Sequence, residues 1–143
     1  MTPALPPTTW NGRSLRWGEQ TFVMAIVNAT PDSFSGDGIG DDVDAGERLA
    51  ADAEAEGADL IDVGAESTRP GHIPLATDEE VRPLLPIVRA IARRTSLPIS
   101  VDTSKAVVAE AALDAGASMV NDVRGFTRDP DLAEVVARRG GPA

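Results

Sequence analysis

Short polar side chains stand where the apolar runs of this chain end. Four runs finish in an Asn or an Asp: Asn28, Asp62, Asp102 and Asn121. In parallel α/β folds, the carboxyl ends of the strands meet at one edge of the sheet, where reactive groups gather. Carboxylates and carboxamides there can pair with the N–H and C=O edges of a heterocycle, or ligate a hard cation such as Mg²⁺. Asn and Asp are also common in turns and caps, but four in equivalent places favour a shared site.

The elements that would position these groups alternate regularly along the chain. Apolar runs predict strands at 22–27, 60–63, 98–101 and 119–120, with the continuous apolar character of strands buried on both faces. Helical spacing of small and apolar residues follows each run, at about 43–57, 77–92, 108–115 and 129–140. Thr77 and Glu80 have the spacing of a capping box. Strand followed by helix, four times, predicts parallel strands with right-handed crossovers.

Two folds of the α/β class are built from such units, the (β/α)₈ TIM barrel and the doubly wound sheet. No G-x-G-x-x-G follows the first run, which disfavours a dinucleotide-binding domain. A complete barrel needs about 200 residues or more, so 143 residues predict a half barrel of four βα units. Asn11-Gly12 between two Trp residues predicts a hairpin. We expect an N-terminal segment and hairpin over 1–20, and the half barrel over 21–143, stopping before the fifth strand.

Composition narrows the class of protein and of partner. The formal net charge of −10 opposes binding to nucleic acid or to anionic lipid. With no Cys, disulfide and thiolate chemistry are excluded. The first nine residues are rich in Pro and Thr and do not resemble a secretion signal, and no run reaches the roughly 18 apolar residues of a membrane span. We therefore expect a cytoplasmic protein.

The loops that follow the first two runs contain groups suited to a phosphorylated ligand. The first loop, 28–38, is longer than a minimal βα connection, and long ordered loops tend to be functional. The second contains Thr68 and Arg69, a hydroxyl and a guanidinium that can grip a phosphate oxygen. Lys105 could also reach a phosphate, but we expect it to be exposed in the first turn of a helix and leave it out of the site.

Four segments, taken together, resemble the dihydropteroate synthase family. The stretch 27–35, Val-Asn-Ala-Thr-Pro-Asp-Ser-Phe-Ser, is similar to the first signature of that family, and 60–71 is similar to its second. The segments 99–103 and 120–125 are similar to its third- and fourth-strand regions. The likeness runs in order from about Trp10 to the last residue. Ala29 stands where the family usually has Val, and the Gly-Asp-Gly ending of the first loop varies the usual Asp-Gly-Gly.

The resemblance implies a TIM barrel that condenses a dihydropterin hydroxymethyl diphosphate with 4-aminobenzoate in folate synthesis. It implies that Asn28 ligates Mg²⁺ held with the diphosphate, and that Thr68 and Arg69 contact the diphosphate or the aminobenzoate. It further implies that Asp102 and Asn121 hold the pterin edge and that Val123 lines the wall beneath the ring. Asp62 is included as a substrate-binding residue that could instead only orient its loop.

No catalytic acid or base is expected in this half, and a homodimer is expected for the full-length enzyme. We expect the isolated chain to be inactive and poorly soluble, or to pair with another copy, because half a barrel exposes two sheet edges and an apolar face. Two alternatives remain open. One is a non-catalytic, truncated pterin-binding module, and the other is the pterin-binding domain of a folate-dependent methyltransferase.

Overall fold

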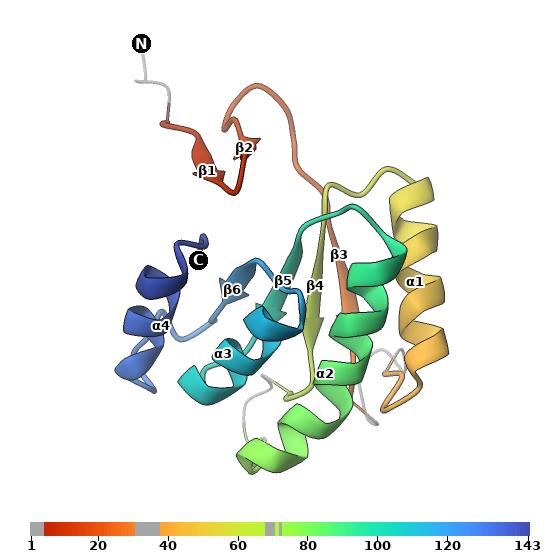
Figure 1. The fold of residues 1–143 in the computed structure, drawn as a ribbon, viewed down its shortest axis with the longest axis vertical. Helices are drawn as coiled ribbons and strands as arrows, with labels where there is room; N and C mark the ends of the chain where they lie inside the picture. Colours follow the sequence, from red (N-terminus) through yellow and green to blue (C-terminus); the bar gives the residue numbers. More distant parts are fainter. Residues whose placement is uncertain (1–4, 31–37, 68–70, 72) are drawn as a thin grey trace.

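The structure is a computed structural model that describes residues 5–30, 38–67, 71 and 73–143. Its main body is a four-stranded parallel sheet in the order β3-β4-β5-β6 (Figure 1). The strands are β3 (Met24–Asn28), β4 (Leu60–Gly64), β5 (Ile99–Asp102) and β6 (Met119–Asn121). Sequential order with parallel neighbours is the arrangement of a (β/α) barrel, and four strands make half of one. The predicted half barrel is confirmed.

A helix follows each strand, and neighbouring helices pack against one another in chain order. They are α1 (Val43–Ala55), α2 (Thr77–Arg94), α3 (Ala106–Ala115) and α4 (Asp131–Arg139). The side chain of Asp42 caps α1 by accepting a hydrogen bond from the Ala45 amide at 2.9 Å. The N-cap residue of α4 is Pro130, which has no side-chain cap bond, and the preceding residue Asp129 accepts a hydrogen bond from the Asp131 amide at 3.1 Å. Within the described ranges, no helix is long and apolar enough to cross a membrane.

The predicted capping box at the start of α2 is wrong by one residue. The residue that reaches back to the start of the helix is Glu79, whose Oε2 accepts a hydrogen bond from the Ala76 amide at 3.0 Å. Thr77 is already helical. Glu80 is fully buried, and its carboxylate accepts a hydrogen bond from the Thr103 hydroxyl instead of capping the helix.

Alternate residues of the strands face opposite sides of the sheet. The helix-facing residues are dry and apolar: Val27, Ile61, Val63, Ile99, Val101 and Val120 are all buried. The opposite face of β3 is open, because Met24 and Ile26 are 41% and 63% exposed. The prediction that strands are buried on both faces is therefore wrong for β3, since it lies at the sheet edge and no described residue covers its far side.

The N-terminal hairpin consists of β1 (Thr8–Trp10) and β2 (Arg13–Leu15), which pair antiparallel. Asn11 and Gly12 have positive φ angles of 44° and 75°, as a two-residue turn of the predicted kind requires. The Arg13 guanidinium donates to the Ser96 carbonyl, just before β5, at 2.7 Å. The hairpin thus lies at the amino ends of the strands (Figure 1), away from their carboxyl ends.

Candidate functional site

The strand ends form one continuous row across the sheet. Asn28 pairs in register with Gly64, Gly64 with Asp102, and Asp102 with Asn121. Neighbours in register on parallel strands direct their side chains to the same face. This face is the one opposite the helices, because the adjacent residues Val27, Val63, Val101 and Val120 occupy the helix-facing core. Three of the strand-end residues expected in the site thus share one rim and one face.

Asp62 lies one pleat below this row, on the same face. Its Oδ2 accepts a hydrogen bond from the Asn121 amide nitrogen at 3.2 Å, and the Ser100 side chain is a second partner. Asp62 is 5% exposed, and its Oδ1 has no hydrogen-bond partner among the described residues. Burial raises the pKa of Asp62 above its ordinary value, and the bonds from Ser100 and Asn121 offset only part of that effect. A carboxylate oxygen is thus held in the interior without a donor.

Asp102 is the most strongly perturbed acid of the rim. Its pKa is raised from 3.8 to about 7, mainly by burial and in addition by the negative charges of Asp62 and Asp122. Such a group can be a carboxylate or a carboxylic acid near neutral pH, so a ligand that donates two N–H groups would favour the ionised form. Acids with strongly perturbed pKa values are a common mark of a functional site.

Gly64 keeps the space beside Asp102 open. A β-carbon at position 64 would lie 3.2 Å from Asp102 Cβ and 3.6 Å from Asp102 Oδ2. The strand-end residue between Asn28 and Asp102 therefore has no side chain to cover the carboxylate. A flat ligand can approach the acid from this direction.

The remaining residues expected in the site are Val123, Thr68, Arg69 and the metal ligand Asn28. Val123 follows β6 and is 63% exposed, so an apolar surface is present just beyond Asn121. Thr68 and Arg69 lie outside the described residues. Within the parts of the chain that the structure describes, no group of three or more His, Cys, Asp and Glu side chains could hold a metal. Asn28 would therefore need oxygen atoms from elsewhere to complete a Mg²⁺ site.

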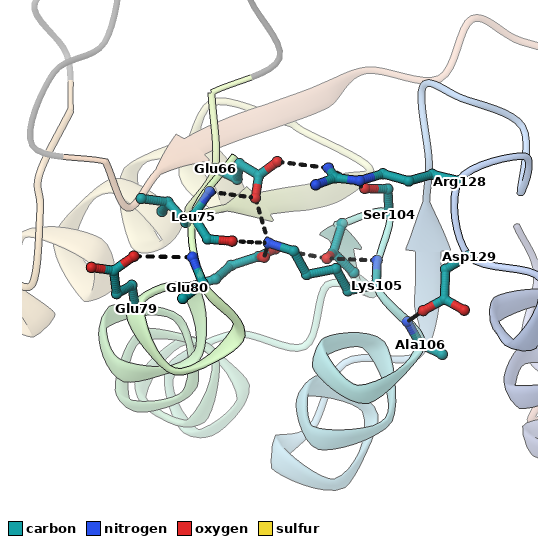
Figure 2. A network of polar contacts seen from close by, with 11 residues as sticks. Glu66, Leu75, Glu79, Glu80, Ser104, Lys105, Ala106, Arg128 and Asp129 are labelled. Atoms are coloured by element: carbon teal, nitrogen blue, oxygen red, sulfur yellow. Dashed lines mark hydrogen bonds and ion pairs between the residues drawn. The ribbon is translucent and has the colours of Figure 1, made fainter. Parts of the chain in front are cut away.

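A buried ionic network that the sequence pattern does not reveal lies beside the rim (Figure 2). Lys105, expected to be exposed, is only 15% exposed and forms ion pairs with Glu66 and Glu80. Glu66 also pairs with Arg128 at 2.9 Å. Burial alone would raise the pKa of Glu66, but the hydrogen bonds from Lys105 and Arg128 outweigh it and lower that pKa. The available signals were the Glu in the second loop and the Lys that follows the third strand.

Comparison with known proteins identifies the family. A family model described as pterin binding enzyme matches residues 24–143. The chain is 46% identical over 125 residues to a dihydropteroate synthase of Clostridium beijerinckii, covering 87% of this chain and 46% of that protein. It is 44% identical over 129 residues to the Bacillus subtilis enzyme of the same name, covering 90% and 45%. The chain therefore spans about half the length of these curated relatives.

Solved structures agree with the sequence relatives. The Yersinia pestis dihydropteroate synthase, solved in a sulfonamide drug complex, matches with a TM-score of 0.87 and 39% identity, over 96% of this chain and 49% of that one. The Clostridium difficile enzyme, solved in the presence of pteroic acid, matches with a TM-score of 0.80 and 43% identity, over 89% and 48%. The half barrel, its strand-end acids and these matches lead to one conclusion: the chain belongs to the pterin binding enzyme family.

Proposed function

We propose that this chain supplies part of the active site of a dihydropteroate synthase. The reaction joins 6-hydroxymethyl-7,8-dihydropterin diphosphate to 4-aminobenzoate. The aminobenzoate nitrogen attacks the pterin methylene carbon, the carbon–oxygen bond to the diphosphate breaks, and the nitrogen loses a proton. The single observation that supports this proposal best is the rim row of Asn28, Gly64, Asp102 and Asn121, with two desolvated acids on one face.

The pterin is the substrate that this rim suits. Its aminopyrimidine edge carries adjacent N–H donors, and Asp102 offers carboxylate oxygens that such donors can satisfy. Asp62 has a buried oxygen without a described partner, and Asn121 offers both a donor and an acceptor beside it. We assign Asp62, Asp102 and Asn121 to the heterocycle edge, and Val123 to the apolar surface beneath the ring.

The diphosphate requires positive charge in a chain with a net charge of −10. We assign Thr68 and Arg69 to the diphosphate or the aminobenzoate, and Asn28 to Mg²⁺. The donor set fits a cation that arrives with its substrate, because Mg²⁺ in phosphate sites takes one or two protein ligands and keeps phosphate oxygens and water. When bound, Mg²⁺ would offset the negative charge that builds up on the leaving diphosphate.

No side chain of this half is needed as a general base, and none is assigned that role. The contribution of the rim residues is to orient the pterin so that its methylene faces the amine. The proposal places the reaction in the cytoplasm, as expected from the composition, and gives the complete protein a homodimeric assembly.

The test is the formation of dihydropteroate from the two substrates, followed by chromatography. Residues 1–143 are assayed alone and as a complete barrel, in which the part of the Clostridium beijerinckii relative that this chain does not match supplies the remaining units. We expect product from the complete barrel and none from the 143 residues alone. A folded, pterin-binding barrel without any turnover would favour the non-catalytic module, and robust turnover by the 143 residues alone would contradict the division of the site.

A further inference from the structure

We propose that Lys105 is a positioning residue that ties the two described ends of the segment between β4 and α2 to each other. The segment, 65–76, contains Thr68 and Arg69, so this inference rests on the proposed function. The anchoring network consists of four charged residues from four parts of the chain: Glu66, Glu80, Lys105 and Arg128.

Lys105 uses all of its hydrogen-bonding capacity inside this network. Its Nζ donates to Glu66 Oε2, to Glu80 Oε2 at 2.5 Å and to the Leu75 carbonyl at 2.8 Å. An ammonium group has three donors, so none is left for a phosphate. Burial alone would lower the pKa of Lys105, but the two carboxylates outweigh it and raise that pKa. Lys105 is therefore a charged structural tie rather than a ligand group.

The contacts of Lys105 join both ends of the segment. Glu66 lies two residues after β4, and Leu75 lies two residues before α2. The Leu75 amide also donates to Glu66 Oε2 at 3.2 Å. The two ends of the segment are thus bonded to each other and to the same ammonium group (Figure 2). A tie of this kind fixes where the intervening residues must start and finish.

Glu80 and Arg128 extend the tie to the next two strand ends. Glu80 Oε1 accepts from the Thr103 hydroxyl at 2.7 Å, directly after β5. Arg128, in the segment between β6 and α4, donates to Glu66 Oε1 at 2.9 Å and to the Ser104 hydroxyl at 3.0 Å. The network therefore locks the segments that follow β4, β5 and β6 to one another.

The network is balanced in charge and largely dry. Two carboxylates face two cations, and the side chains of Glu66, Glu80 and Lys105 are 13%, 1% and 15% exposed. Removal of one partner from a buried ion pair leaves the other charge uncompensated, which is far more damaging than loss of a surface pair. Without Lys105, the Glu66 and Glu80 carboxylates would repel one another, and the start of the segment would have to move.

Such a movement would change how the substrates are held and how fast they react. A displacement of about 1 Å in a substrate-positioning group can cost about 100-fold in rate. Because Thr68 and Arg69 follow Glu66 in sequence, a shift of Glu66 changes their starting point. The effect should appear in substrate binding, and a residue needed only for folding would instead reduce the amount of active protein.

The experiment compares Lys105→Met, which removes the charge, with Lys105→Arg, which keeps it. The control is Arg48→Met, which removes a positive charge from an exposed site on α1. Hydrogen exchange of the 143-residue chain is followed by mass spectrometry, which reports local opening. We expect exchange in peptides covering 64–76 to become about tenfold faster or more in Lys105→Met, and to change less than about threefold in the other two variants.

The same variants are then assayed in the complete barrel. We expect Lys105→Met to raise KM for the diphosphate or the aminobenzoate about tenfold or more, with kcat less affected, and Lys105→Arg to restore it. Unchanged exchange in Lys105→Met would overturn the inference, as would an unchanged KM. If the unsubstituted barrel forms no dihydropteroate, the proposed function fails, and the exchange data still decide separately whether Lys105 anchors the segment.

Discussion

The two faces of the sheet differ in what they contribute to the molecule. The helix-facing side carries Ile61, Val63 and Val101, all fully buried in one apolar core. The opposite side carries Asp62 and Asp102, whose burial raises the pKa of both. Apolar burial on the first face stabilises the folded chain. Burial of the two carboxyl groups on the second face destabilises it, because their charged forms lose contact with water. The acidic face therefore lowers the stability of the folded chain, and a bound ligand whose N–H groups pair with the acids can offset this loss.

The largest loss of stability is expected from a substitution on the helix-facing side of the sheet. Ile61→Ala should lower the free energy of unfolding by about 2–5 kcal/mol, because the side chain is fully buried and its removal leaves a cavity. Ile26→Ala is the matched change on the other face, where the side chain is 63% exposed, and should cost less than about 1 kcal/mol. Urea unfolding of the dilute 143-residue chain measures both. Equal losses would mean that the far face of β3 is covered in solution.

On the opposite face, which carries Asp62 and Asp102, a substitution is expected to stabilise the chain, by a smaller amount. The folded chain holds the Asp102 proton up to about pH 7, above the ordinary value of 3.8. The stabilisation that comes from the protonated Asp102 carboxyl group is therefore fully present below about pH 4 and is lost as the pH rises through 7. Asp102→Asn removes the ionisable group, so it should raise the free energy of unfolding by about 1–3 kcal/mol at pH 8 and have little effect at pH 4.

Urea unfolding at pH 4, 6 and 8 checks this pH dependence. Asp52→Asn is the control, because Asp52 lies exposed on α1. A stabilisation of the same size at every pH would show that the gain comes from something other than ionisation of Asp102.

The sequence contained most of the information about the rim. Each strand was marked by an apolar run, and the ends of β3, β5 and β6 by an Asn or Asp, and both signals are local. The end of β4 was placed at Asp62 but lies two residues later, at Gly64. The register that aligns Asn28, Gly64, Asp102 and Asn121 follows once the strands are parallel and sequential. The exposed face of β3 was not predicted, because an apolar run does not reveal whether a neighbour covers each side.

The ionic network could not be predicted from the sequence in the same way. Glu66, Glu80, Lys105 and Arg128 come from four segments, and their meeting depends on how α2 and the strand-end segments pack. Glu80 also had a local explanation, since its spacing from Thr77 fits a capping box. The structure assigns that role to Glu79. Thr68 and Arg69 were predicted from their chemistry and stay predictions.

Binding of a pterin to the complete barrel tests the central claim most directly. Isothermal titration with 6-hydroxymethylpterin would give the dissociation constant of the unsubstituted protein, of Asp102→Asn and of the Asp52→Asn control. We predict that Asp102→Asn weakens binding about 100-fold or more, because it removes the carboxylate that accepts the N–H groups of the heterocycle, and that the control binds normally. Binding by Asp102→Asn within about threefold of the unsubstituted protein would contradict the assignment of this rim to the pterin.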